Sequence, residues 1–119
     1  MLFGDNGADM LFGNDDNDVL LGGRGMDTLD GGAGDDLMLG GKGADVFVFS
    51  EGTDRVFDVD GAQVSLDLSA AEGIDDLADL FANHVEQEGS TITIQDDAGN
   101  AMILHCIELA ELETTEILF

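Results

Sequence analysis

The chain has few of the residues on which several common protein functions depend. Of its 119 residues, three are Lys or Arg, one is Cys and none is Pro. The lone Cys106 excludes an intramolecular disulfide and a cysteine-rich zinc site, and its apolar neighbours predict a small buried side chain. Three cations against 27 acidic residues give a net charge of −24, which repels nucleic acid and anionic membrane surfaces. Such a charge favours cations as partners.

The sequence also lacks the segments that direct a chain into or across a membrane. No apolar run is long enough to span a bilayer. Residues 1–10 contain neither a basic region nor a continuous apolar stretch, so they do not form a cleavable signal peptide. Export of this chain is therefore expected to use another route.

A nonapeptide repeat dominates the first half of the chain. The chain is 44% hydrophobic and contains 17 glycines, so a disordered acidic polymer is not expected. Aspartate recurs at intervals of nine, and an apolar residue follows each aspartate by two positions. The six aspartates are Asp9, Asp18, Asp27, Asp36, Asp45 and Asp54. The apolar residues are Leu11, Leu20, Leu29, Met38, Phe47 and Val56.

Residues 22–48 show the repeat most clearly, as GGRGMDTLD, GGAGDDLML and GGKGADVFV. These units match G-G-x-G-x-D-x-U-x, with U apolar, the nonapeptide of calcium-binding β-helices. The first part of each unit makes a turn and the last part makes a short strand. Glycine permits left-handed backbone angles, so successive carbonyl groups can point into one concavity, and the aspartate adds an anionic oxygen that suits Ca²⁺. Asn and Asp replace glycine at residues 14–17 and tolerate the left-handed region.

Two units make one flattened coil, so each turn is expected to stack on the turn two units later, with a calcium ion between them. The stacked pairs are Asp9 with Asp27, Asp27 with Asp45, Asp18 with Asp36, and Asp36 with Asp54. They predict about four Ca²⁺ sites, the Asp54 site weakest because Phe49 makes its unit degenerate. The glycines expected at these sites are Gly4, Gly7, Gly22, Gly23, Gly25, Gly31, Gly32, Gly34, Gly40, Gly41 and Gly43. Aspartates that only cap turns are the alternative, but this leaves the stacking of like charges unexplained.

After Phe57 the repeat gives way to a different pattern. Residues 55–70 read as strand, turn and strand, residues 74–88 have the apolar spacing of a helix, and residues 91–107 read as a hairpin. The helix and the hairpin are expected to cap the end of the repeat array. The expected apolar stripe of the helix is Ile74, Leu77, Phe81 and Val85.

Other polar residues beyond the repeat allow more than one interpretation. Asp58, Asp60 and Asp67 are either solvated turn acids or ligands of an additional calcium ion. His84 and His105 lack metal-binding spacing, which favours packing or surface roles over zinc binding. The terminal residues 116–119 form either a final strand on the cap or a recognition tail.

These patterns predict an all-β fold, a right-handed parallel β-roll with a small C-terminal cap containing one helix and a β-hairpin. The calcium β-roll is expected over residues 1–57 and the cap over residues 58–119.

The sequence resembles the repeats-in-toxin, or haemolysin-type calcium-binding, family over nearly its whole length. The nonapeptides of residues 4–57 carry the resemblance, followed by GADVFVFS, FDVD, LDLSA, the acidic helix, LHCIELAEL and an acidic-aliphatic terminus ending in Phe. Cys106 stands where the family often has Gly. The resemblance implies a substrate of an ATP-driven type I exporter in a Gram-negative bacterium, which reads an uncleaved C-terminal signal, here the last part of the chain ending in 116–119. It also implies a chain that crosses unfolded and folds outside the cell on binding calcium.

Other functions fit the sequence less well. The acidic residues are periodic and a thin roll offers no obvious cleft, so the chain is not expected to be an enzyme. A calcium-stabilised module for adhesion or polysaccharide binding is the main alternative. An open first coil would expose apolar stacking surface, so end-to-end self-association is a further expectation.

Overall fold

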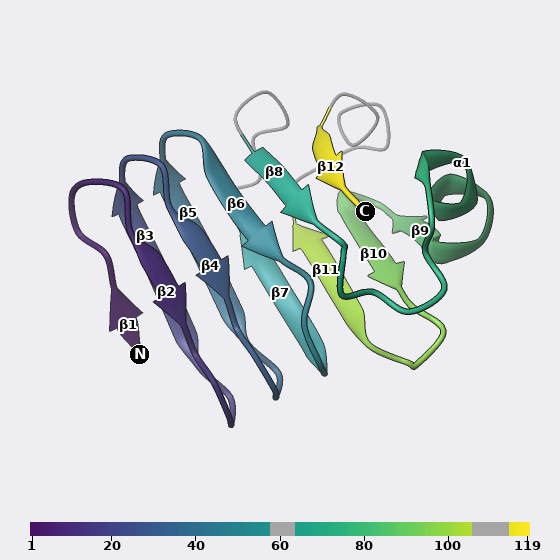
Figure 1. Ribbon diagram of the computed structural model, residues 1–119, viewed down its shortest axis with the longest axis horizontal. Coiled ribbons are helices and arrows are strands. Elements are labelled where there is room, and N and C mark those ends of the chain that lie inside the picture. The colour runs from purple at the N-terminus through teal and green to yellow at the C-terminus, as the bar shows by residue number, and fades with distance from the viewer. Residues whose placement is uncertain (58–63, 106–114) are drawn as a thin grey trace.

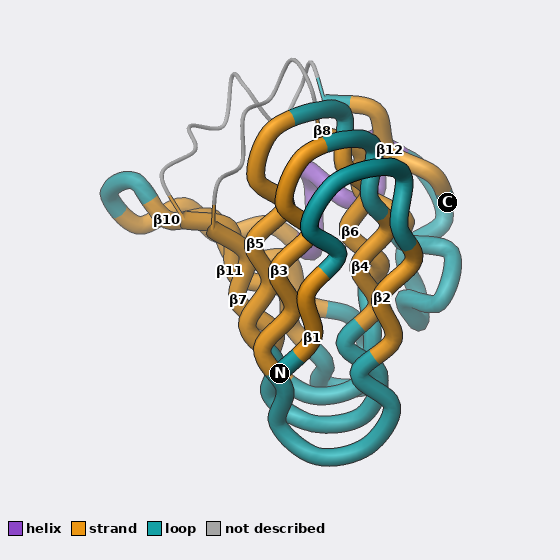
Figure 2. Tube along the Cα trace, turned by 90° about the vertical axis from the view of Figure 1, so that its left-hand side faces the viewer, coloured by secondary structure: helices purple, strands orange, loops and turns teal. Residues whose placement is uncertain are grey.

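The computed structural model describes residues 1–57, 64–105 and 115–119, which form two β-sheets and one short helical segment (Figure 1). The seven-stranded first sheet has the order β1-β3-β5-β7-β11-β10-β9, and the five-stranded second sheet has the order β12-β8-β6-β4-β2. Figure 2, from the N-terminal side, shows the two sheets facing each other with turns joining them. The strands are β1 (Leu2–Phe3), β2 (Met10–Phe12), β3 (Val19–Arg24), β4 (Thr28–Asp30), β5 (Leu37–Lys42), β6 (Asp45–Val48), β7 (Thr53–Phe57), β8 (Val64–Asp67), β9 (Val85–Glu88), β10 (Thr91–Gln95), β11 (Ala101–His105) and β12 (Glu116–Leu118).

Parallel pairing between successive coils has a period of two nonapeptide units. In the first sheet Leu20 pairs with Leu2 on one side and Met38 on the other. In the second sheet Leu29 lies between Leu11 and Phe47 in the same way. Successive units alternate between the sheets, so each strand stacks on the strand two units away. The prediction of an all-β parallel β-roll is confirmed.

The second half of the chain extends both sheets. Strand β8 adds to β6, where Phe47 pairs with Leu66, so this step is one residue longer than two repeat units. Strand β11 adds in parallel to β7, and β10 and β11 form the expected hairpin, with Ile92 opposite Leu104. Both sheets therefore continue beyond residue 57, and the division into two domains there remains a prediction.

The helix expected over residues 74–88 is present only over residues 77–84, and the prediction is wrong at both ends. The helical segment consists of α1 (Leu77–Asp79) and a π-helical turn (Leu80–His84), and Val85–Glu88 forms β9 instead. Strand β9 pairs with β10 and satisfies the open edge of the hairpin, which outweighs the weak helical spacing. Of the expected apolar stripe, Ile74 is buried and Phe81 and Val85 pack against the core, whereas Leu77 is exposed and Leu80 is buried instead. No helix among the described residues is long and apolar enough to cross a bilayer.

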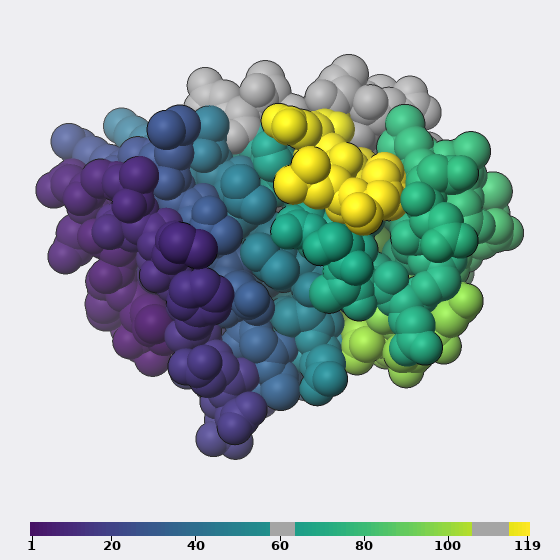
Figure 3. All heavy atoms as spheres, in the orientation of Figure 1, coloured from purple at the N-terminus to yellow at the C-terminus, as the bar shows by residue number. Residues whose placement is uncertain are grey.

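The C-terminal residues form an edge strand. Strand β12 pairs in parallel with β8, with Ile117 opposite Leu66. Figure 3 shows these residues, in yellow, at the surface beside the teal segment that contains β8. Of the two interpretations of residues 116–119, the final strand is thus present in the folded chain, and it joins the second sheet of the roll. Asp58, Asp60 and Cys106 lie outside the described residues.

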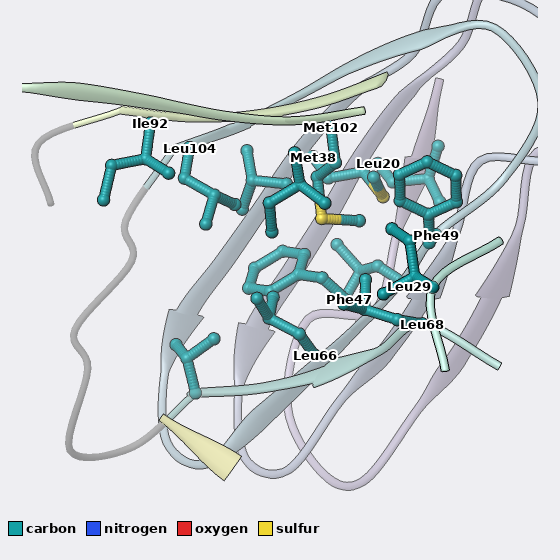
Figure 4. Packing of buried hydrophobic residues seen from close by; sticks show 14 of the residues in the cluster. Leu20, Leu29, Met38, Phe47, Phe49, Leu66, Leu68, Ile92, Met102 and Leu104 are labelled. Atoms are coloured by element: carbon teal, nitrogen blue, oxygen red, sulfur yellow. The ribbon is translucent and has the colours of Figure 1, made fainter. Parts of the chain in front are cut away.

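A single hydrophobic core fills the space between the sheets (Figure 4). The U residues of the repeat all point into it, with Leu11 4% exposed and Leu20, Leu29, Met38, Phe47 and Val56 fully buried. The core continues into the second half of the chain through Ile92, Ile94, Met102 and Leu104, which are also fully buried. The cap therefore closes one end of the same core.

Candidate metal centre

The turns between the strands repeat one backbone conformation. Positive φ angles occur at two positions in each of the first five units and at one position in the sixth, and they recur with the period of the repeat. They fall on Asp5, Asn14, Gly23, Gly32 and Gly41 at the first position, and on Gly7, Asp16, Gly25, Gly34, Gly43 and Gly52 at the second. Asn14 and Asp16 adopt φ of 73° and 72°, so the second unit keeps the turn without glycine, as expected. Asp5 does the same in the first unit, which the sequence analysis had not anticipated.

The aspartates of the repeat form two ladders, one along each set of turns. Asp9 N–H donates to Asp27 Oδ1 over 2.9 Å, and Asp27 N–H donates to Asp45 Oδ1 over 3.0 Å. On the other set, Asp18 N–H donates to Asp36 Oδ1 over 2.7 Å, and Asp36 N–H donates to Asp54 Oδ1 over 3.1 Å. All four pairs predicted from the sequence are therefore in contact.

The second carboxylate oxygen of four aspartates is buried without any hydrogen-bond partner. These oxygens are Oδ2 of Asp9, Asp18, Asp27 and Asp36. The Asp27 and Asp36 residues are only 1% and 2% exposed. A buried acceptor left unpaired costs roughly 1–3 kcal/mol, and more when it is charged. Like-charged carboxylates stacked along a ladder add to this penalty, so the site needs a cation to be stable.

The space beside three of the four orphaned oxygens, those of Asp9, Asp18 and Asp27, is lined by a backbone carbonyl oxygen as well. A Cβ added to Gly22 would lie 2.6 Å from Asp27 Oδ2 and 2.6 Å from the Gly40 carbonyl oxygen. A Cβ on Gly4 would likewise meet Asp9 Oδ2 and the Gly22 carbonyl oxygen, and one on Gly13 would meet Asp18 Oδ2 and the Gly31 carbonyl oxygen. Carboxylate and carbonyl oxygens around a small glycine-lined space fit a hard cation such as Ca²⁺.

Backbone carbonyls have to supply part of any ligand set here. Among the described residues, no three His, Cys, Asp or Glu side chains converge on one point. Of the predicted glycines, Gly4, Gly22, Gly31 and Gly40 approach the aspartates of their own units, whereas Gly23, Gly25, Gly32, Gly34, Gly41 and Gly43 pack on the turn of the preceding coil, and a Cβ on Gly7 would meet nothing. The glycines therefore differ in role, although the sequence motif treats them alike.

The ladder through Asp18 and Asp36 ends at Asp54. There the Ser50 hydroxyl donates to Asp54 Oδ2 over 2.7 Å, so this oxygen is paired. Asn100 Oδ1 accepts from Gly52 N–H over 3.0 Å in the same turn. Burial raises the pKa of Asp54 to about 6, against an ordinary value of 3.8. At this end of the ladder, the Ser50 hydroxyl and the Asn100 side-chain amide thus make the hydrogen bonds that another coil would otherwise make.

Replacing Asp54 with Asn tests the effect of this buried charge. Because its pKa is raised, the folded chain favours the protonated form of Asp54. The contribution of this protonated form to the stability of the folded chain is fully present below pH 3.8 and is lost as the pH rises through about 6. We expect Asp54→Asn to be more stable than the parent chain by at most about 2–3 kcal/mol above pH 6 and similar below pH 4. Urea unfolding at both pH values measures this; an equal difference at both would contradict it.

A second ladder on the same side was missed by the sequence analysis. Asp35 N–H donates to Asn17 Oδ1 over 2.8 Å, and Thr53 N–H donates to Asp35 Oδ1 over 2.9 Å. These residues are also two units apart and immediately precede the repeat aspartates, so the same spacing could have revealed them. Asp35 is exposed, which distinguishes it from the buried ladder.

The remaining candidates make ordinary contacts, although His105 Nε2 is buried without a hydrogen-bond partner among the described residues. His84 Nδ1 lies 2.8 Å from the Gln95 carbonyl oxygen, and the His105 ring stacks on Phe57 with centroids 4.3 Å apart. Asp67 accepts from the Ser69 hydroxyl over 2.6 Å, which supports its interpretation as a turn acid. These contacts give the two histidines packing roles.

A family model matches the repeat, and a solved structure is similar in fold. A family model described as the RTX calcium-binding nonapeptide repeat matches residues 1–28 and 21–56. The crystal structure of the extracellular lipase LipA from Serratia marcescens is similar in fold, with a TM-score of 0.64 and 19% identity, over 95% of this chain and 20% of the lipase. The AlgE6R3 subunit of the Azotobacter vinelandii mannuronan C5-epimerase matches with a TM-score of 0.39 and 26% identity, over 98% of this chain and 80% of that subunit. No curated protein sequence matches the chain.

The chain thus spans a fifth of the length of the lipase. The repeat of glycine and aspartate, the parallel roll and the matching family model agree with one another. Residues 1–56 belong to the RTX calcium-binding nonapeptide repeat family, and they form a structural calcium-binding β-roll module.

Proposed function

We propose that the chain holds about four Ca²⁺ ions, each beside one of the four orphaned aspartate oxygens. The observation that carries this assignment is the agreement between the four orphaned oxygens and the four aspartate pairs. In each pair, the first aspartate offers its free Oδ2 and the second holds the turn by accepting the N–H of the first. Native mass spectrometry in calcium is expected to show four bound ions, and a chain that binds none or one would contradict the proposal.

Calcium binding on this proposal controls folding. The chain carries a charge of −24, and four ions would reduce this to −24 + 8 = −16. Extracellular calcium modules bind with Kd values of roughly 10⁻⁴–10⁻³ M, so their sites are empty in the cytosol and filled outside. Each filled site adds stability by mass action. The chain would therefore remain unfolded inside the cell and fold outside it.

Folding that depends on calcium fits a role in protein secretion. We infer that the chain is the C-terminal module of a larger secreted protein of a Gram-negative bacterium, exported by a type I system without a cleaved signal. Repeats of this family and the fold likeness to an extracellular lipase support this inference. In the folded chain residues 116–118 lie in β12, paired with β8, so an exporter could read them as a free tail only before folding.

Deletion of residues 116–119 tests the secretion signal. We expect the deletion to reduce extracellular protein at least about tenfold in a strain with a type I system, because the exporter loses its terminal recognition element. Among the described strands, β12 pairs with β8 alone, so the deletion should leave the turns and their calcium stoichiometry intact. Immunoblots of cells and medium measure export. Leu77→Ala, a change at another exposed apolar residue, serves as the control. Unchanged export of the deleted chain would contradict the assignment.

A further inference from the structure

The last repeat turn, residues 49–54, lacks features that shape the other turns. Phenylalanine and serine replace the two glycines that open the clearest units. The turn has one positive φ angle, at Gly52, where each of the first five units has two. It nevertheless stacks on residues 31–36, whose Asp36 carries one of the four orphaned oxygens. Contacts from outside the repeat therefore have to help to hold its shape.

Asn100 supplies one of these contacts and takes the place of a backbone carbonyl. In three other turns, the glycine at the second positive-φ position donates its N–H to a carbonyl oxygen of the next coil. These bonds run from Gly7 to Arg24 over 2.8 Å, from Gly25 to Lys42 over 2.8 Å, and from Gly34 to Glu51 over 3.2 Å. Gly52 N–H donates instead to Asn100 Oδ1 over 3.0 Å. The side-chain amide of Asn100 therefore makes the bond that the next coil makes elsewhere.

Asp96 holds Asn100 in the orientation that this bond needs. Asp96 Oδ2 accepts from Asn100 Nδ2 over 3.1 Å, and Asp96 Oδ1 accepts the Asn100 N–H over 2.8 Å. Because the amide nitrogen faces a carboxylate, the amide oxygen faces Gly52. Asp96 is 6% exposed and also accepts the N–H groups of Ala98 and Glu72. Burial acts to raise the pKa of Asp96, but these hydrogen bonds outweigh burial and hold the pKa below its ordinary value, so the carboxylate stays charged.

The hairpin also contacts the last turn through its backbone. Ala101 N–H donates to the Gly52 carbonyl oxygen over 2.8 Å, and Ala101 pairs with Thr53 where β11 joins β7. In Figure 1 the turn between β10 and β11 lies at the same end of the sheet as the turn between β6 and β7. On its other side, the last turn accepts Asp36 N–H at Asp54 Oδ1 over 3.1 Å. The last turn is therefore held between the Asp36 turn and the hairpin.

We propose that the hairpin turn, residues 96–100, positions the last repeat turn for the calcium ion beside Asp36, with Asn100 as the positioning residue. The proposal rests on the calcium assignment above and adds that one of the four sites depends on the cap. Beside each of the other three orphaned oxygens lies a glycine carbonyl of the next coil, whereas the residue in that position for Asp36 is Phe49 of the last turn. Calcium affinity depends on the rigidity of a site as well as on its ligand charge, so a last turn without this support binds the ion less tightly.

Calorimetry and native mass spectrometry of the whole chain in calcium test the proposal. Asn100→Ala removes the acceptor for Gly52 N–H, and we expect one of the four ions to bind about tenfold more weakly while the other three bind as in the parent chain. Asn83→Ala is the matched control, because it also removes a hydrogen bond of a side-chain amide in the cap, from Asn83 Nδ2 to Asp79 Oδ1. This control should leave all four affinities unchanged. Circular dichroism confirms that each variant is folded.

Double variants identify the site that responds. At the calcium concentration that just fills the parent chain, Asp36→Asn alone and Asp36→Asn with Asn100→Ala should both hold three ions, because the two changes act on one site. Asp9→Asn with Asn100→Ala should hold two ions, because these changes act on different sites. Asn100→Asp keeps an acceptor for Gly52 N–H and should retain the fourth ion, although its charge beside Asp96 lowers the stability of the cap. An Asn100→Asp chain that loses this ion as completely as Asn100→Ala would contradict a role through the Gly52 bond.

Coupling between the calcium site and the hairpin has to be reciprocal. Asp36→Asn is therefore expected to speed hydrogen exchange of the backbone amides in β10 and β11 more than Asp9→Asn does. Exchange and the Asn100→Asp chain decide the question if Asn100→Ala does not fold. A parent chain that binds no calcium would end the calcium function itself. A parent chain with four ions, and an Asn100→Ala chain that matches it at every site or is weaker at all four alike, would overturn the proposal and leave the calcium function intact.

Discussion

Removing calcium from the folded chain is expected to abolish most of its β-structure. Four buried carboxylate oxygens would then lack any partner, and the total penalty at roughly 1–3 kcal/mol each or more is comparable to the whole stability of a small domain, about 5–15 kcal/mol. The stacked negative charges of each ladder add to this penalty. Circular dichroism with and without a chelator measures the change.

The specificity of this transition can be checked with a second cation. Mg²⁺ requires a smaller octahedral site and loses its water reluctantly, so it is not expected to restore the structure at millimolar concentration. Refolding by calcium but not by magnesium would show that the glycine-lined spaces select the larger ion. Identical spectra in calcium and in chelator would show that the ladders close without metal, and would end the proposal of a folding switch.

The second large effect is expected from substitutions of Asp27, the aspartate at the centre of its ladder. The two carboxylate oxygens of Asp27 have separate roles: Oδ1 accepts the N–H of Asp9, and Oδ2 is the orphaned oxygen beside Gly22 and the Gly40 carbonyl. Asp27→Asn keeps an acceptor for Asp9 but removes the charge. We therefore expect Asp27→Asn to fold at high calcium with calcium affinity at least about tenfold lower, which calorimetry measures.

Asp27→Ala is expected to have the larger effect. It removes the metal ligand and also leaves the Asp9 N–H without its acceptor, so we expect a loss of roughly 2–4 kcal/mol of stability in saturating calcium. Urea unfolding measures this loss.

Asp35 offers a matched control for the Asn substitution. Asp35 accepts the Thr53 N–H through Oδ1 in the same way, but it is exposed and has no orphaned oxygen. Asp35→Asn should therefore leave calcium affinity unchanged. Equal losses of affinity in Asp27→Asn and Asp35→Asn would show that the charge of the turn as a whole binds the ion, and not the buried ladder.

The repeat could be predicted from the sequence because its interactions join residues at one constant separation along the chain. Each aspartate and each U residue meets an equivalent residue two units away, so one unit predicts the environment of every other. The spacing alone predicted the coil length, the four aspartate pairs and the buried U residues such as Phe47. It also explains why Asn14 and Asp16 keep the turn, since the backbone there needs only tolerance of positive φ.

Tertiary structure decided what happens where the period ends. Residues 85–88 became a strand because β10 offered them an open edge, which the apolar spacing of the expected helix could not reveal. Ser50 and Asn100 complete the last turn from positions far apart in the sequence. The sequence by itself determined the repeating roll, because each unit of a periodic chain pairs with the equivalent unit of the next coil. Only the folded structure determined the cap, because it arises from pairings between segments that share no period.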